Sequence, residues 1–116
     1  MMLELFLVNL FKTNGVKLYK TIPSSLSMPY TVYDRLSGEP DLYHRYCRGS
    51  FAFDIYGKDM EQINDQFSKI KKIFKDLEKS DDRFIQADIY NFVDNTIDEK
   101  SIIYSIYVDF LHLEDL

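Results

Sequence analysis

The sequence predicts an α+β domain in which a long amphipathic helix and a short N-terminal helix pack on one face of an antiparallel sheet of four to five strands. Two observations lead to this fold class. Apolar and polar residues alternate over 50–56 and again over 101–111, which is the period of a strand with one buried face. Over 60–77 the apolar residues instead recur at steps of three and four, which is the period of a helix.

The first part of the chain predicts a short helix over 3–12. Its apolar residues fall on one stripe, and Asn14 and Gly15 follow, both of which tolerate the left-handed conformation that ends a helix. Three further segments are expected after this helix: an edge strand, a loop rich in Pro and Ser, and a strand rich in β-forming residues, over 16–22, 23–29 and 30–36.

The centre of the chain predicts a strand that leads directly into the long helix. Phe51, Phe53 and Ile55 share one side of an extended backbone, and Gly57 ends the alternation. After the glycine the apolar residues form one helical stripe, which comprises Met60, Ile63, Phe67, Ile70, Ile73, Phe74 and Leu77. This strand–glycine–helix unit therefore has one buried face on each element.

Polar residues define the ends of the long helix. Asp59 and Gln62 have the spacing of a capping box, so we expect the helix to begin directly after Asp59. Acidic residues concentrate in its first half and lysines in its second half, which complements the helix dipole.

The last part of the chain predicts a β-hairpin over 84–93 and 101–111. The second strand has the clearer pattern, with one apolar and one mixed face. The residues expected on the core face are Ile102, Tyr104, Ile106, Val108 and Phe110. Those expected on the opposite face are Ser105, Tyr107 and Asp109.

The composition restricts the function classes. The 116 residues fit a single domain spanning 1–116. The formal net charge of −5 argues against wholesale binding to a nucleic-acid backbone, because nucleic-acid readers usually carry a basic face. Cys47 is the only cysteine, which excludes an intrachain disulfide and fits a reducing, cytoplasmic setting. The apolar N-terminal segment is too short to span a bilayer, so no membrane partner is expected.

The sequence contains none of the common catalytic motifs. It has no phosphate-binding loop, dinucleotide fingerprint or nucleophile elbow. Asp41, His44 and Cys47 have a spacing that could bind zinc from one helical turn, but the neighbouring arginines favour a solvated loop. His44 could also activate Cys47 as a nucleophile, yet no third residue orients the pair. We therefore expect no enzyme activity, catalytic site, metal site, cofactor or small-molecule substrate.

A polar and aromatic segment is the strongest candidate for function. We expect a long excursion over 34–49 between two strands that pair, because 37–40 has turn chemistry and long loops are often functional. Its mixture of aromatic residues and arginines is typical of a protein interface, with a plain loop as the equal alternative and stacking on nucleic-acid bases as a weaker one. The candidate interface residues are Tyr43, His44, Arg45, Tyr46 and Arg48.

Two tyrosines outside this segment add to the candidate interface. Tyr56 and Tyr107 are expected on the sheet face opposite the core, where a neighbouring subunit could contact them. Most of the other tyrosines on predicted strands are expected to pack on the sheet while their hydroxyl groups reach water.

The order of three sequence pieces points to a family. The first is the N-terminal helix that ends near Asn14-Gly15 and is followed by 16–23, and the second is Met28-Pro-Tyr-Thr-Val-Tyr33. The third is the strand–glycine–helix unit, and the closing hairpin completes the order. In this order the chain resembles the small tail-completion proteins of long-tailed bacteriophages, also called tail terminators or head–tail joining proteins. The family often has Trp near the end of the strand before the helix, where this chain has Tyr56.

The resemblance implies a structural role. Proteins of this family form a ring, usually of six copies, at the head-proximal end of the tail tube, where the ring stops tube growth and contacts the head connector. The expected partners are therefore further copies of the chain, the tail tube and the head connector, and DNA passes through the ring without specific binding. The expected location is the virion neck, and the host cytoplasm during assembly.

The sequence leaves a second interpretation open. A small acidic binding module, similar to an immunity or antitoxin protein that plugs a basic partner, would have the same negative charge and aromatic surface. The two interpretations differ in assembly: the first predicts rings, and the second predicts a monomer or dimer that forms a one-to-one complex.

Overall fold

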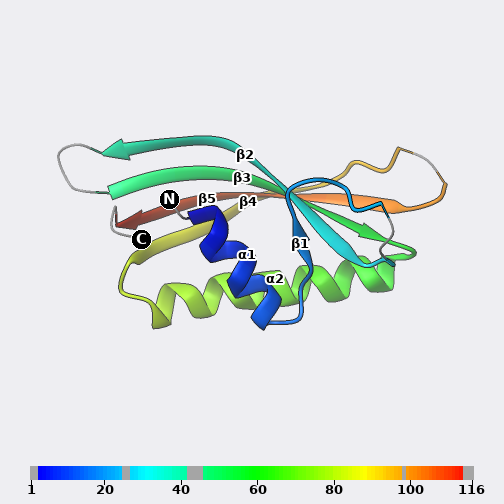
Figure 1. Cartoon of the computed structure of the whole chain (residues 1–116), viewed down its shortest axis with the longest axis horizontal. Coiled ribbons are helices and arrows are strands. Elements are labelled where there is room, and N and C mark those ends of the chain that lie inside the picture. The colour runs from blue at the N-terminus through cyan, green and yellow to red at the C-terminus, as the bar shows by residue number, and fades with distance from the viewer. Residues whose placement is uncertain (1–2, 25–26, 42–45, 98, 114–116) are drawn as a thin grey trace.

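Two helices pack on one face of a five-stranded sheet (Figure 1). The computed structural model describes residues 3–24, 27–41, 46–97 and 99–113. The elements are α1 (Leu3–Thr13), β1 (Leu18–Tyr19), β2 (Tyr30–Asp41), β3 (Tyr46–Gly57), α2 (Met60–Ser80), β4 (Phe84–Asp94) and β5 (Ile102–Leu113). The predicted α+β class is confirmed, with the long and the short helix in the expected places.

The sheet has the strand order β1-β2-β3-β5-β4 and is mixed. The four long strands pair antiparallel, as predicted, whereas β1 pairs parallel with β2. The edge strand expected over 16–22 is only two residues long, with Leu18 opposite Thr31 and Tyr19 opposite Val32. The pair is parallel because the connection after β1 carries the chain back along the sheet before β2 begins.

The excursion expected over 34–49 is wrong, because most of this segment belongs to two strands. β2 continues to Asp41 and β3 begins at Tyr46, so the strands form a long hairpin whose connection, 42–45, lies outside the described residues. Pro40 is accommodated because β2 is an edge strand beyond its short pairing with β1, and a missing N–H costs no ladder bond there. Gly49 lies against α1, where an added Cβ would come within 3.3 Å of the Leu3 side chain.

An aromatic core fills the space between the sheet and the helices. Phe53 lies with its ring centroid 5.4 Å from that of Phe11 on α1 and 5.7 Å from that of Phe74 on α2. Phe110 of β5 meets Phe74 edge-on at 5.3 Å. Edge-on and offset ring pairs of this kind add to the burial energy, so the cluster ties both helices to the middle of the sheet.

The ends of both helices follow the sequence signals. Asp59 caps α2 through a hydrogen bond in which the Gln62 N–H donates to Asp59 Oδ1 at 2.9 Å, and Gln62 Oε1 accepts from the Lys58 N–H. Gly15 has a φ of 78°, the left-handed conformation expected after α1. One member of the predicted stripe departs from it: Met60, in the first turn of α2, is exposed.

Candidate interaction surface

The sheet face opposite the helices is not covered by any described helix, and we call it the open face. On β3 it carries Arg48, Ser50, Ala52, Asp54 and Tyr56, which alternate with the buried core residues. The antiparallel register brings the neighbouring strands onto the same face, so that Tyr107 of β5 lies opposite Ala52. Tyr107 and Tyr56 thus lie on the face where the sequence predicted them.

One end of the open face is closed by the turn after β4. Asn95 Nδ2 donates to Ser105 Oγ at 2.6 Å, and Ser105 Oγ donates to Asp54 Oδ1 at 2.6 Å. These bonds satisfy the hydroxyl group of Ser105, which is buried. The chain Asn95–Ser105–Asp54 therefore fastens the turn to the sheet, and this part of the face serves packing.

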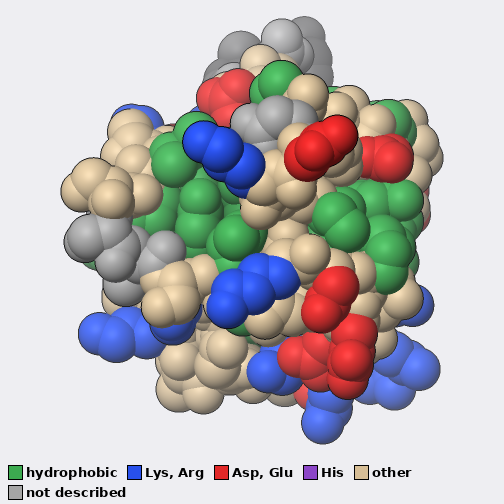
Figure 2. Space-filling model, turned by 90° about the vertical axis from the view of Figure 1, so that its right-hand side faces the viewer, with side chains coloured by type: hydrophobic (Ala, Val, Ile, Leu, Met, Phe, Trp, Pro, Cys, Tyr) green, Lys and Arg blue, Asp and Glu red, His purple; other side chains and the backbone are tan. Residues whose placement is uncertain are grey.

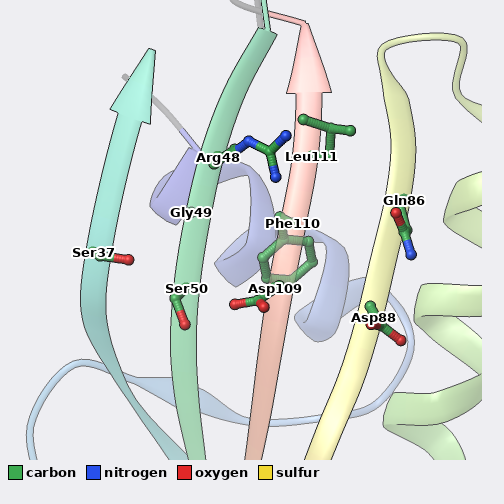
Figure 3. Close-up of a pocket in the computed structure, with 9 residues that line it drawn as sticks. All are labelled: Ser37, Arg48, Gly49, Ser50, Gln86, Asp88, Asp109, Phe110 and Leu111. Atoms are coloured by element: carbon green, nitrogen blue, oxygen red, sulfur yellow. The ribbon is translucent and has the colours of Figure 1, made fainter. Parts of the chain in front are cut away.

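The other half of the open face contains a hollow of about 440 Å³ (Figure 3). Arg48 reaches from β3 toward β5, while Asp88 and Asp109 lie on β4 and β5 on the same face of the sheet (Figure 3). The side chains that line it come from four strands and are mostly polar: Ser37, Arg48, Ser50, Gln86, Asp88, Asp109 and Leu111. We call this depression, together with the residues that line it, the hollow.

The charges in the hollow are not balanced. Asp88 and Asp109 are direct partners in the antiparallel register of β4 and β5, and both are exposed. Like charges directly opposite on neighbouring strands are destabilising. Arg48 is exposed and lies opposite Leu111 on β5. It forms no ion pair with another residue in the described part of the chain.

Two tyrosines extend the polar and aromatic character beyond the hollow. The hydroxyl groups of Tyr90 and Ser50 lie within hydrogen-bond distance, at 3.3 Å. The Tyr90 ring lies 6.1 Å from the ring of Tyr107, and Tyr90 is 51% exposed. Exposed Tyr and Arg side chains are enriched at protein interfaces.

The structure separates the residues of the predicted interface. Tyr43, His44 and Arg45 lie outside the described residues, and Tyr46 is the half-buried first residue of β3. Arg48 is part of the hollow. Tyr56 lies eight residues further along β3 than Arg48, which is about 26 Å in an extended strand.

Tyr56 belongs to a separate aromatic pair at the far end of the sheet. Its ring stacks on that of Tyr30 with the centroids 4.9 Å apart. Burial raises the pKa of the Tyr56 hydroxyl above 10.0, and the nearby Asp54 and Tyr30 add to this shift. The stacked pair and its partial burial indicate a packing role for Tyr56.

Five residues of the hollow were missed in the sequence: Ser37, Ser50, Gln86, Asp88 and Leu111. For Tyr90 the sequence predicts only ordinary strand packing. The alternation with Phe110 places Asp109 on the correct face, but nothing in the sequence indicates that Asp88 is its partner on the neighbouring strand. That pairing depends on the register of two strands, which has irregularities between Phe84 and Gln86 and between Ile89 and Asn91.

A second exposed area lies at the end of the molecule where α2 begins. Figure 2 shows hydrophobic side chains gathered there in two areas with polar and charged groups between them. Met60 begins α2 at this end, and Ile97, which is 86% exposed, lies in the turn between β4 and β5. A hollow beside the start of α2 is lined by Pro29 and by polar residues, namely Asp59, Glu61, Gln62 and Asp65.

The described residues also bear on the zinc spacing considered in the sequence. No group of three or more His, Cys, Asp or Glu side chains lies close enough together there to hold a metal ion. Asp41 and Cys47 lie on strands, so the helical turn that the zinc spacing of Asp41, His44 and Cys47 would need is not formed at these two residues. Cys47 is opposite His112 on the helix-covered face, away from the hollow. Neither helix is long and apolar enough, over its described residues, to cross a membrane.

No protein-family model matches this chain, and no curated protein sequence matches it significantly. Function is therefore inferred from the order of the sequence elements and from the chemistry of the open face.

Proposed function

We propose that this chain is a non-enzymatic virion assembly protein of a long-tailed phage or prophage, which caps the tail tube and joins it to the head as a ring. The proposal has two supports. One is the resemblance of the element order to tail-completion proteins. The other, which carries most weight, is the uncovered sheet face with Arg48, Tyr90 and Tyr107 around a polar hollow.

The open face supports an assembly role better than a catalytic one. Its hollow is broad and spans four strands, and the charged groups in it are exposed to solvent. Enzyme sites usually need a pocket that excludes water and groups whose pKa is shifted by burial. An exposed surface of Tyr, Arg and Asp is instead suited to a second protein surface, which would desolvate these groups on contact.

The acidic charge fits the proposed location. In this account the ring lies at the neck of the virion, between the tail tube and the head connector, and assembles in the host cytoplasm. A protein with a net charge of −5 repels DNA, so the DNA would pass through the ring without being held.

The test is negative-stain microscopy of the purified chain and of the Arg48→Glu variant at low salt. The chain is expected to form closed rings with a central hole, and Arg48→Glu is expected to reduce them because Arg48 projects from the open face. Lys17→Glu is the matched control, since Lys17 is exposed between α1 and β1, away from this face. A protein that stays monomeric and instead forms a one-to-one complex with a basic partner would contradict the proposal and favour an immunity or antitoxin role.

A further inference from the structure

The outward side of α2 carries a row of lysines. Lys72, Lys75 and Lys79 are exposed and recur at intervals of three and four residues, on the side of the helix away from its buried residues. Among the described residues, these three lysines form no ion pair. Other lysines of the helix have local contacts, since Lys69 pairs with Asp65 at 3.4 Å and Lys71 lies over the Phe67 ring.

The open face carries the opposite sign on the other side of the molecule. Its hollow is lined by Asp88 and Asp109, which are register partners on neighbouring strands, and by Arg48. Two exposed acids lie among these lysines, Asp76 and Glu78. Glu78 turns toward β4, where its Oε1 accepts from the Ala87 N–H at 2.8 Å, so Asp76 is the acid left on the outward side. Each surface thus has a majority charge and one group of the other sign, and the two patterns are complementary.

The dimensions of the two surfaces also agree. The hollow spans four strands, which is about 14 Å at the usual spacing of strands in a sheet. An α-helix with its side chains is about 10–12 Å across. A helix can therefore lie on the open face and bring its lysines to the two carboxylates.

We infer that the outward face of α2 in one copy docks on the open-face hollow of the next copy. Lys72, Lys75 and Lys79 then neutralise Asp88 and Asp109, and Arg48 meets Asp76. The two surfaces are different and lie on opposite sides of the sheet, so the contact is head-to-tail, the type that forms a ring when the rotation between copies closes and an open filament when it does not. This inference rests on the proposed ring and identifies its subunit contact.

The lysines have a simpler explanation that the experiment must exclude. Cations near the C-terminus of a helix interact favourably with its dipole, whether or not a partner is present. This explanation predicts that the lysines affect the stability of the helix and leave the association of copies unchanged.

The test reverses the charge of each surface separately and measures mass by light scattering at low salt. The sheet variant is Asp88→Lys with Asp109→Lys, and the helix variant is Lys72→Glu with Lys75→Glu. Each alone is expected to associate at least about tenfold more weakly than the parent chain, because like charges then meet at the contact. The control for the helix variant is Lys12→Glu with Lys17→Glu, which changes the net charge equally at exposed positions elsewhere.

The decisive sample is an equimolar mixture of the two variants. In a head-to-tail contact, the reversed sheet of one variant meets the reversed helix of the other, and the two unreversed surfaces also match. Association is therefore expected to return in the mixture and to weaken with added salt. A helix variant that still associates alone would point to a contact between two sheets, and would overturn the inference.

Three further results would also overturn it: a parent chain that is monomeric at low salt, variants that associate like the parent, or a mixture that stays monomeric. Circular dichroism confirms that each variant is folded. Rings in the micrographs that are insensitive to these reversals would leave the proposed function standing without this contact. Charge-dependent association without rings would leave the contact standing and remove the ring.

Discussion

A single buried hydroxyl group stands out at the residue scale. Thr31 is fully buried beneath the helices, and its Oγ1 has no hydrogen-bond partner among the described residues. An unsatisfied buried hydroxyl loses its hydration without compensation, whereas Val has nearly the same shape and no such group.

We predict that Thr31→Val stabilises the chain by about 1 kcal/mol and raises Tm by roughly 4 °C. Thermal unfolding followed by circular dichroism measures the change. A loss of stability of similar size would mean that the hydroxyl is satisfied, and would contradict this description of the site.

The paired carboxylates of the open face should cost stability in the isolated monomer. Asp109→Asn is predicted to stabilise the monomer by about a few tenths of a kcal/mol, because Asp88 then faces a neutral side chain. The gain should vanish at high salt, which screens exposed charges. Asp34→Asn is the control, since Asp34 lies opposite Ala52. Urea titrations at two salt concentrations test this, and an equal effect of both substitutions would contradict it.

His112 provides a pH-dependent contribution. Burial lowers the pKa of His112 below 6.5, and Arg35 acts in the same direction, while the hydrogen bond to the Leu113 carbonyl opposes them. The unfolded chain therefore binds a proton at a pH where the folded chain resists it. The free energy of unfolding should fall as the pH drops below 6.5 and through the folded-state pKa.

His112→Gln is predicted to remove this part of the pH dependence, while it lowers stability at every pH by disturbing the packing on Phe84. The measurement is Tm between about pH 8 and pH 5, above the range in which carboxylates titrate. His44→Gln serves as the control for the other histidine of the chain. Parallel curves for the parent chain and His112→Gln would show that His112 does not titrate differently on folding.

At the scale of elements, the cap of α2 is a local device with a measurable effect. Asp59 Oδ1 accepts from the Gln62 N–H at 2.9 Å, and removal of this acceptor leaves an N–H of the first turn without its partner. Asp59→Ala is predicted to destabilise the chain by about 1 kcal/mol, and Asp59→Ser by much less. Chemical denaturation of both variants tests the cap, and equal losses would indicate that charge at this position matters more than the hydrogen bond.

The elements that the sequence predicts well are those with a strong local pattern. The alternation of Phe51, Phe53 and Ile55 and the helical stripe that ends at Leu77 each specify a buried face without knowledge of their partners. The hairpin of β4 and β5 was predicted for the same reason. Its second strand was slightly underestimated, since it continues to Leu113.

The elements that sequence patterns missed depend on tertiary context. Gly38, Pro40 and Gly49 suggest a loop, yet all three lie in the β2–β3 hairpin. The hairpin accepts them because β2 is at the edge of the sheet beyond its short pairing with β1, and because α1 packs close to Gly49. The sequence of a single strand reveals neither its place in the sheet nor the helix that packs on it. The sequence therefore predicts an excursion over this segment.

At the scale of the whole molecule, the candidate surface is a product of register. Its charged residues come from three strands: Arg48, Asp88 and Asp109. They are known to share one surface only when the pairing of these strands is known. The two irregularities of β4 shift which of its side chains face the hollow. The period-two pattern of the sequence therefore predicts the strands of the fold. It does not predict which side chains of β4 face the hollow.

The charge distribution of the whole molecule follows from the same arrangement. The helix layer places an exposed row of lysines on one side, and the sheet leaves its acidic hollow on the other. In the proposed ring, these two surfaces would attract each other between copies, while the net charge of −5 would repel DNA. Both properties suit a ring through which DNA passes.

The most direct test of the account is the mass of the assembled chain, measured by native mass spectrometry from a low-salt solution. We predict one dominant closed species made only of this chain. Six copies are expected, because this is the usual number in the family that the chain resembles. The species is expected to be lost in the Arg48→Glu variant. A monomer alone, or an open series of increasing sizes, would contradict the claim that this chain closes into a ring.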